Sequence, residues 1–393
     1  MDFGRIWAEI DLSALNHNLG QVRSLVPDRK MMVAVKADAY GHGLSEIALE
    51  LQGKVEAFGV AGVEEGAHLR EAGVDRTDII VLSPVPYSEI PLLFERSLVP
   101  SVTELEFARR LSAESRLRDA GIQVHIEVDT GMGRTGISVS ETAEFIPAVA
   151  GLPGLEVQGV FTHFPAADND VAFTESQVKE YEQLLDRLEA KGLGPFVRHA
   201  ANSAGLMNVP VSRLDMARPG LVVYGILPDS YYKGERETGL DLKPVMSLRS
   251  RIVNLRDIPA GRSISYDRNF FTKHDSRIAV ITAGYGDGYP WSLTNRGQAI
   301  VSGRRVPVVG NVCMDLTMLD VTGVQDVSIG QTVTLFGTAD GVTIPVNEVA
   351  AAAGTIPYEI ICRVSPRVPR VYLKNGKITE VRNLLSNPDR NRL

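Results

Sequence analysis

Lys36 is the residue whose type and position most directly indicate chemistry in this sequence. It follows the apolar run Met31–Val35, which has the length and bulk of a strand buried on both faces, and it precedes the glycine-rich segment ADAYGHG. A lysine at such a strand end loses part of its hydration, which lowers the pKa of its amine and makes the amine a usable nucleophile. Lysines at strand ends also often extend to the surface, so Lys36 indicates a site only if other reactive residues gather around it.

Other polar residues occupy the same kind of position, directly after an apolar run. Taken singly, each has a structural explanation, because glycine-rich loops are mostly turns and a lone histidine is more often structural than catalytic. Their repeated position after predicted strands favours one shared site. They are Asp129 and Arg134 in VDTGMGRTG, His163 in FTHFPAAD, Asn202 and Ser203 in RHAANSAG, and Arg218, Gly220 and Tyr224 in ARPGLVVYG.

The first part of the chain alternates short apolar runs with helical patterns. Eight such units predict an α/β fold, a (β/α)8 TIM-like barrel over residues 1–240, whose active site would form at the carboxyl ends of the strands. The predicted strands are Met31–Val35, Ala57–Val60, Asp78–Leu82, Leu98–Val102, Gln123–Val128, Leu155–Phe161, Val197–Ala201 and Leu214–Ala217, and the helices between them include Leu44–Leu51, Val63–Ala72, Thr103–Ser112, Thr142–Ala150 and Phe173–Lys191.

After about residue 240 the runs become shorter and richer in β-branched residues, with turn residues between them. Asn375-Gly376 separates Val371–Leu373 from Lys377–Val381, which is a strong signal for a two-residue hairpin. One helical pattern, Val346–Ala353, interrupts the series. Residues 241–393 are therefore predicted to form a second, mostly antiparallel β domain.

Two of the polar residues also indicate a phosphate site. Ser203 and Gly220 follow predicted strands seven and eight, where barrels of this kind commonly bind phosphate. Backbone N–H groups near a glycine, together with a hydroxyl, bind anions well. A reactive lysine opposite a phosphate site indicates pyridoxal 5'-phosphate held as a Schiff base. An aldolase that uses Lys36 without a cofactor also accounts for the lysine alone.

Composition excludes several classes of protein. A net charge of -7 and a pI near 5.6 argue against a nucleic-acid partner or an anionic membrane surface. No tract is long and apolar enough to span a membrane, and the first residues do not have the pattern of a secretory signal. The two cysteines, Cys313 and Cys362, have neither disulfide-framework nor metal-ligand spacing. We therefore expect a cytoplasmic protein without a metal.

With these motifs in place, the sequence resembles the alanine racemase family of fold-type-III pyridoxal-phosphate enzymes. The resemblance covers nearly the whole chain in the family's order and implies a barrel followed by a β domain. The motifs that carry it are WAEIDLSALNHN, VAVKADAYGHG, VDTGMGRTG, FTHFPAAD, HAANSAG, ARPGLVVYG, SISYDRNF, GYGDGYP, NVCMD and IPYEIICRVSPRVPRVY.

The resemblance implies a racemase that interconverts L- and D-alanine with two bases. Lys36 would hold the cofactor and act as one base, and Tyr266 would act as the other, with His163 and Arg218 completing the catalytic set. It also implies a homodimer whose subunits share their active sites. The implied cofactor-binding set adds Tyr40, Asn202, Ser203, Gly220, Leu221 and Tyr358, and the implied substrate site consists of Arg134, Met314, Tyr285 and Asp315.

The sequence departs from the family's pattern at Asp38, Trp291, Pro366 and Glu127. Many family members carry a carbamylated lysine at the position of Glu127. Strand alternation places His125, Glu127 and Asp129 on one face, which we predict points into the barrel. The predicted partner of Glu127 is Arg134, with a water or a neighbouring side chain closing the gap; a salt bridge to His125 or a solvent-facing carboxylate is the structural alternative.

Besides the cofactor-free aldolase, three other functions compete with alanine racemisation. A racemase of broader specificity has the same machinery, and pocket volume cannot be derived from one sequence. A fold-type-III decarboxylase shares the barrel and the lysine but lacks a base tyrosine in an SYD context. A non-catalytic carrier of pyridoxal phosphate needs no second base. By resemblance, the product would be D-alanine for peptidoglycan.

Overall fold

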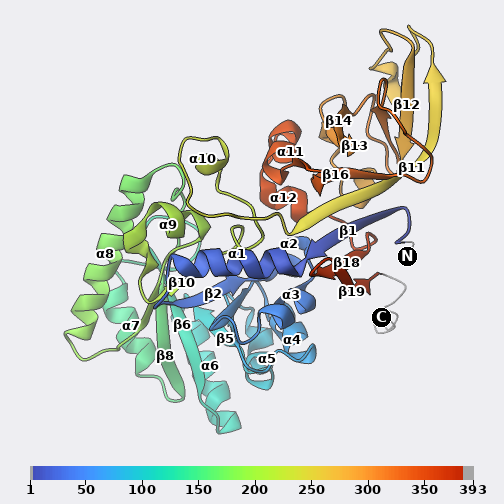
Figure 1. Ribbon diagram of the computed structural model, residues 1–393. Coiled ribbons are helices and arrows are strands. Elements are labelled where there is room, and N and C mark those ends of the chain that lie inside the picture. The colour runs from blue at the N-terminus through green and yellow to red at the C-terminus, as the bar shows by residue number, and fades with distance from the viewer. Residues whose placement is uncertain (1–2, 384–393) are drawn as a thin grey trace.

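The computed structural model describes residues 3–383, which form two parts. Figure 1 shows a barrel surrounded by helices and a β domain that projects to one side of it. Within residues 3–383, no helix combines the length and apolar character that a membrane span requires.

Eight parallel strands close into a ring, because β2 pairs with β10 and β5 pairs with β6. This confirms the predicted fold class. The eighth strand is shorter than predicted, since Leu214 has a positive φ of 43° that a strand does not accommodate. The ring consists of β2 (Lys30–Ala34), β3 (Ala57–Val60), β4 (Asp78–Val81), β5 (Val99–Val102), β6 (Ile122–Asp129), β8 (Leu155–Phe161), β9 (Val197–His199) and β10 (Met216–Ala217), and β7 (Ile137–Ser138) pairs with β6 outside it.

Helices cover the outside of the ring. Helix α1 (Leu12–Ser24) begins where the Asp11 carboxylate accepts the N–H groups of Ser13 and Ala14 at 2.8 and 3.0 Å. The other barrel helices are α2 (Lys36–Gly41), α3 (Leu44–Leu51), α4 (Val63–Glu71), α5 (Ile90–Glu95), α6 (Leu105–Arg118), α7 (Thr142–Ala150), α8 (Val171–Glu189) and α9 (Ser203–Asn208), and α10 (Asp229–Tyr232) lies in the connection to the β domain.

The barrel strands have two differently buried faces. On β6, the side chains of Val124, Ile126 and Val128 are fully buried in the main hydrophobic core, and burial of each aliphatic side chain contributes about 1.5–3 kcal/mol. A separate cluster of Met32, Ala57, Ile80, Val99 and Met216 comes from the strands β2 to β5 and β10. The face of β6 opposite the valines carries polar side chains, which are described with the site.

The second sheet contains both ends of the described chain. Its pairings between residues 6 and 382 are antiparallel except for that of β1 with β18. Its elements are β1 (Ile6–Asp11), β11 (Met246–Ile258), β12 (Ser276–Ile281), β13 (Gln298–Val301), β14 (Arg304–Pro307), β15 (Thr317–Asp320), β16 (Thr332–Ala339), β17 (Val342–Ile344), β18 (Arg370–Lys374) and β19 (Lys377–Arg382), with helices α11 (Val346–Ala353) and α12 (Pro357–Cys362).

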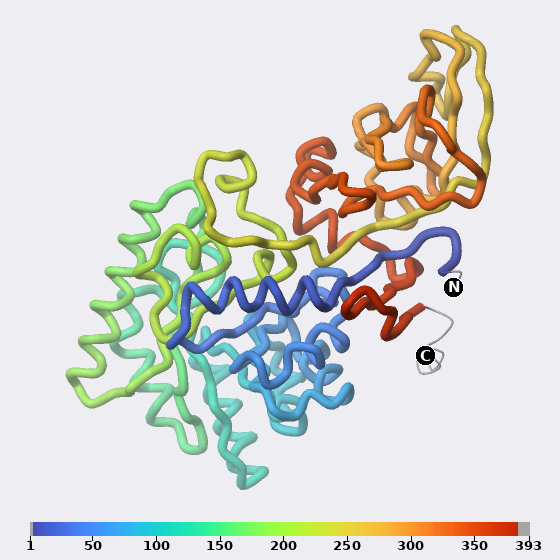
Figure 2. Tube along the Cα trace, viewed as in Figure 1, coloured from blue at the N-terminus to red at the C-terminus, as the bar shows by residue number. Residues whose placement is uncertain are grey.

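Strand β1 is an exception to the predicted division at residue 240. It lies between β11 and β18, with Ala8 opposite both Leu248 and Arg370, so it belongs to the β sheet rather than to the barrel. Figure 2 shows this N-terminal segment beside the red C-terminal hairpin. The sequence analysis predicted no strand here, and a local pattern cannot show which sheet accepts one, because the pairing joins residues more than two hundred positions apart.

Arg370 connects this sheet to the barrel through hydrogen bonds. Its buried guanidinium donates to the carbonyl oxygens of Val364, Ser365 and Val368 at 2.6 to 2.8 Å and to that of Gly41, at the end of α2, at 3.1 Å. Buried carbonyl groups need such donors, and one arginine supplies four of them.

We predict that Arg370→Met destabilises the protein by roughly 3 kcal/mol or more, because each buried carbonyl left without a donor costs about 1–3 kcal/mol. The midpoint of urea unfolding, followed by circular dichroism, measures the change. Arg363→Met is the matched control: Arg363 is exposed and pairs with Glu359 at 2.9 Å, so it should cost no more than about 0.5 kcal/mol. Equal midpoint shifts in the two variants would contradict the role given to Arg370.

Candidate active site

A cavity of about 550 Å³ lies at the carboxyl ends of the barrel strands. It brings together most of the predicted site residues. It also contains residues directly after β4 that the sequence analysis did not single out. Their position at the end of a strand could have predicted them as site residues. The predicted residues that line it are Lys36, Tyr40, Arg134, His163, Asn202, Ser203, Arg218, Gly220 and Tyr358, and the additional ones are Ala34, Leu82, Ser83, Pro84, Thr135 and Phe161.

Lys36 begins an unusual segment of backbone. The four residues Ala37–Tyr40 have φ values between 51° and 55°, which makes them a left-handed helical turn. Each L-residue in this conformation costs about 1–2 kcal/mol. The turn is held by bonds from the N–H of Ala37 to Glu65 Oε1 at 2.6 Å and from the N–H of Gly43 to the Asp38 carbonyl at 2.9 Å. Because of this turn, Lys36 and Tyr40 both line the same cavity.

The surroundings of Lys36 favour its neutral amine. Partial burial lowers the pKa of the amine, and the positive charges of Arg134 and Arg218 lower it further, while Glu65 acts in the opposite direction. A lower pKa increases the fraction of unprotonated amine at neutral pH. The surroundings of Lys36 therefore favour the unprotonated form that a nucleophile requires.

Arg218 is buried beneath the cavity and has no carboxylate within ion-pair distance among residues 3–383. Its guanidinium donates to the carbonyls of Thr162 and Ala200 at 2.7 and 3.0 Å, to His199 Nδ1 at 2.9 Å and to His163 Nδ1 at 3.2 Å. Burial lowers the pKa of Arg218 to about 10, so the group stays charged at neutral pH. Burial, and then the charge of Arg218, lowers the pKa of His163 to about 3, so His163 is a neutral acceptor.

One corner of the cavity contains the residues predicted to bind phosphate. The N–H of Gly220 donates to Ser203 Oγ at 2.9 Å, and the rings of Tyr40 and Tyr358 lie 5.7 Å apart. A Cβ added at Gly220 would lie 2.9 Å from the Tyr40 hydroxyl, so a larger residue here would displace the Tyr40 side chain. Asn202 caps α9 by accepting the N–H of Gly205 at 2.9 Å. Leu221 is buried next to Gly220 and does not line the cavity.

Glu127 points into the barrel as predicted, with 2% of its surface exposed. No ion pair joins it to Arg134; instead the hydroxyl of the neighbouring Thr135 bonds to it, and its Oε2 has no hydrogen-bond partner. Burial raises the pKa of Glu127, while Thr135, Arg134 and Arg218 lower it. The alternative pairing with His125 is wrong, because both ring nitrogens of His125 bond to other side chains.

The remaining predicted residues gather elsewhere, on a face of the β domain formed by Tyr266, Tyr285, Met314 and Asp315. Tyr266, Tyr285 and Met314 are 70%, 46% and 54% exposed, respectively. None of the four residues lines the cavity. Backbone bonds from Tyr285 to Cys313 and from Gly286 to Met314, at 3.0 and 2.9 Å, hold two of the loops together. We call this group the β-domain face. Within one chain it is separate from Lys36.

The loops that form the β-domain face pack closely against one another. A Cβ at Gly284 would lie 2.2 Å from the Cys313 carbonyl oxygen, so the two loops approach as closely as glycine allows. Asp315 accepts from Arg367 at 2.7 Å, and Arg367 also donates to Asp287 at 2.8 Å. Trp291, which departs from the family pattern, is 57% exposed.

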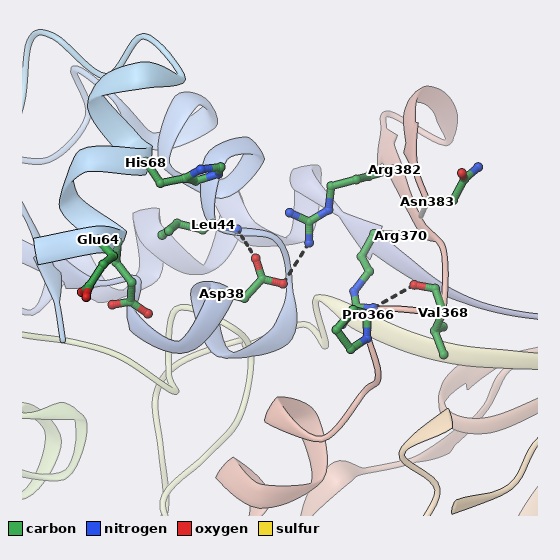
Figure 3. Close-up of a pocket in the computed structure, with 10 residues that line it drawn as sticks. Asp38, Leu44, Glu64, His68, Pro366, Val368, Arg370, Arg382 and Asn383 are labelled. Carbon is green, nitrogen blue, oxygen red and sulfur yellow. Dashed lines mark hydrogen bonds and ion pairs between the residues drawn. The ribbon is translucent and has the colours of Figure 1, made fainter. Parts of the chain in front are cut away.

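A second cavity, of about 350 Å³, lies between the start of the barrel and the C-terminal hairpin (Figure 3). Asp38 accepts the N–H of Leu44 at 2.9 Å and pairs with Arg382 at 2.8 Å, and Arg370 is occupied by carbonyls. Pro366 lies on its wall. The departures at Asp38 and Pro366 therefore belong to the contact between barrel and hairpin rather than to the cavity that contains Lys36.

Comparison with known proteins identifies the family. The family model described as alanine racemase, N-terminal domain, matches residues 10–228, and the one described as alanine racemase, C-terminal domain, matches residues 245–372. An alanine racemase of Desulfosudis oleivorans is 40% identical over 96% of this chain and 98% of its own length. One of Halothermothrix orenii is 41% identical over 93% and 96% of the respective chains.

Solved structures agree. An alanine racemase of Clostridium difficile 630 superposes with a TM-score of 0.90 at 32% identity, covering 97% of this chain and 98% of the other. The alanine racemase of Bacillus anthracis with bound L-Ala-P has a TM-score of 0.89 at 33% identity, over 98% of this chain and all of the other. With both parts of the chain matched and the cavity residues in place, the chain belongs to the alanine racemase family.

Proposed function

We propose that this protein interconverts L- and D-alanine, using pyridoxal phosphate bound at Lys36 and two bases, Lys36 and Tyr266. The observation that carries the proposal is the cavity itself, where an amine with a lowered pKa meets a buried guanidinium and the corner predicted to bind phosphate. Solved relatives include a complex with cycloserine and a complex with bound L-Ala-P, which supports an alanine-like substrate here.

The residues of the cavity fit pyridoxal phosphate. Lys36 would bond its aldehyde carbon, Arg218 would face its ring nitrogen, and Tyr40, Ser203, Gly220 and Tyr358 would bind its phosphate in one corner of the cavity. When bound, the cofactor supplies an electron-withdrawing ring that stabilises negative charge at the substrate's α-carbon.

Arg218 suits a racemase in particular. A guanidinium holds its protons too tightly to give one to a ring nitrogen, and Arg218 remains charged at neutral pH. Facing the ring nitrogen of the bound cofactor, Arg218 would limit how much negative charge leaves the α-carbon and so would favour return of a proton to that carbon over transamination.

Inversion at the α-carbon requires a proton to leave one face and another to arrive at the opposite face. Lys36 serves one face. Tyr266 is 70% exposed on the β-domain face and lies outside the cavity of its own chain. We therefore propose a homodimer in which the β-domain face of one subunit covers the cavity of the other, an isologous arrangement with two shared sites.

The same arrangement completes the substrate site. Arg134 lines the cavity and would bind the substrate carboxylate, together with the N–H of Met314 from the covering subunit. Tyr358 from the cavity and Tyr285 from the covering face would limit the size of the side chain. Asp315, fixed by Arg367, would lie at the entrance.

We further propose a cytoplasmic role in supplying D-alanine for peptidoglycan. A broad-specificity racemase is the second candidate, because it would use the same two bases. A panel of L-amino acids with chiral analysis of the products separates the two. Conversion confined to alanine supports the first, and comparable rates with serine or lysine support the second. Decarboxylated products, or none with any amino acid, would contradict both.

The first prediction tests Lys36. The purified wild-type protein should be yellow with bound cofactor and should lose colour with hydroxylamine, whereas Lys36→Ala should lose both the colour and essentially all racemase activity, measured by chiral chromatography. Lys54→Ala is the control, because Lys54 pairs with Glu50 at 2.8 Å on the barrel surface and should leave both properties unchanged. Full activity of Lys36→Ala without added amines would refute the proposal.

The second prediction tests the shared site. Equal amounts of Lys36→Ala and Tyr266→Ala proteins, unfolded and refolded together, should recover roughly a quarter of wild-type activity, because about half of the dimers are mixed and each mixed dimer has one intact site. Each variant refolded alone should stay inactive. If mixed dimers form, shown by differently tagged subunits, and no activity returns, both residues act within one chain.

The third prediction concerns Glu127. Glu127→Gln keeps an acceptor for Thr135 and removes the charge near Arg134, so it should raise KM more than it lowers kcat. Glu127→Leu removes the acceptor as well and should raise KM by about tenfold or more, the effect of roughly 1.4 kcal/mol. The wild-type rate should not change in buffer freed of carbon dioxide. Inactivation there, with rescue by bicarbonate, would show that a carbamate elsewhere has the role assigned to Glu127.

A further inference from the structure

A continuous column of hydrogen-bonded side chains descends from Arg218 through the interior of the barrel. Arg218 donates to His199 Nδ1 at 2.9 Å. The next contact, between His199 Nε2 and His125 Nδ1, is 2.8 Å long, and His125 Nε2 lies 3.0 Å from Gln158 Oε1. Both histidines are buried, with at most 1% of their surface exposed.

The column continues to the opposite end of the barrel. The Gln158 side-chain amide donates to Gln123 Oε1 at 3.0 Å, and the Gln123 amide donates to Glu156 Oε2 at 3.3 Å. Glu156 is exposed near the start of β8, whereas Arg218 follows the end of β10. The column therefore joins the cavity to the far face of the barrel.

The fold makes room for this column at one place in particular. The pairing of β6 with β8 shifts register between Val124 and His125, which leaves Gln158 as the extra residue of a β-bulge. The next residue is Gly159, where an added Cβ would lie 2.7 Å from the His125 ring. Phe161 stacks on His199 with ring centroids 5.0 Å apart. Bulge, glycine and stacking together fix both imidazole rings.

The two ends of the column fix the direction of every bond in it. A guanidinium can only donate and an ionised carboxylate can only accept, so each group between Arg218 and Glu156 must accept on one side and donate on the other. His199 and His125 are then both neutral, with the proton on Nε2 and the lone pair on Nδ1. Any other tautomer would place two donors or two acceptors face to face.

We propose that His125 and Gln158 are positioning residues for Arg218, because they hold His199 in the tautomer whose Nδ1 accepts from the guanidinium. Without that acceptor, the guanidinium would keep its bonds to the carbonyls of Thr162 and Ala200 but would lose the contact that fixes its remaining terminal nitrogen. The inference rests on the proposed function only where it assigns Arg218 to the cofactor's ring nitrogen.

The test compares two substitutions of Gln158. Gln158→Leu removes the acceptor for His125, whereas Gln158→Glu keeps an acceptor and ends the column two steps earlier, with a carboxylate at residue 158 in place of the one at Glu156. Nitrogen-15 NMR of histidine-labelled, cofactor-free protein should show His125 and His199 protonated only at Nε2 in the wild type and in Gln158→Glu. In Gln158→Leu both rings should show mixed tautomers. Ser101→Ala is the control, because Ser101 is a buried barrel residue that donates to the Val81 carbonyl, outside the column.

A second measurement reports on Arg218 itself. Gln158→Leu should bind pyridoxal phosphate at least fivefold more weakly than the wild type and bind its 1-deaza analogue, which has no ring nitrogen, with unchanged affinity. His125→Phe should behave like Gln158→Leu and serves as the second variant if that protein does not fold. A single Nε2-protonated tautomer of His199 in both variants would overturn the inference. Failure of the wild type to bind the cofactor, with the tautomers as expected, would refute the proposed function and leave the column's role in place.

Discussion

The structure depends on one constraint: the positive charge of Arg218 is buried with no carboxylate at ion-pair distance among residues 3–383. Arg218 is accommodated by two carbonyl oxygens and two imidazole nitrogens, all neutral acceptors. An isolated buried charge is costly, and acceptors with oriented dipoles reduce that cost without neutralising the charge. These acceptors come from β9 and from the residues directly after β8 and β9, so the three neighbouring strands β8, β9 and β10 must pair before the charge can be held.

That charge then influences its neighbours. Burial lowers the pKa of Lys36 and of His163, and the charge of Arg218 lowers both further, which favours an unprotonated amine and a neutral imidazole. The left-handed turn after Lys36 has a conformational cost of its own, which the bond from Ala37 to Glu65 offsets in part. Both features are unfavourable for stability in isolation and acceptable only because the surrounding barrel is well packed.

Sequence patterns predicted the barrel, because buried parallel strands and amphipathic helices leave local signatures at Met31–Val35 and seven later runs. They also predicted the hairpin, where Asn375 and Gly376 adopt the positive φ values of 52° and 71° that a type I′ turn needs. Most of the predicted cavity residues followed from strand ends, whereas Tyr358 and the roles proposed for Tyr266 and Met314 came only from family resemblance. Three features left no local signal: the sheet that accepts β1, the left-handed turn, and the contact of His199 with Arg218. Each depends on residues distant in sequence or on backbone geometry that tertiary contacts impose.

The position of β1 has a consequence for the order of folding. Residues 6–11 leave the ribosome long before one of their two partner strands, β18, which begins at Arg370. The barrel strands and their helices are complete by residue 217, so this part of the chain can collapse while β1 still lacks that neighbour. Contacts of such long sequence separation form slowly, because the intervening loop must close first. Strand β1 can therefore complete its place in the sheet only after β18 has been synthesised, and this pairing joins two elements that lie far apart in the sequence.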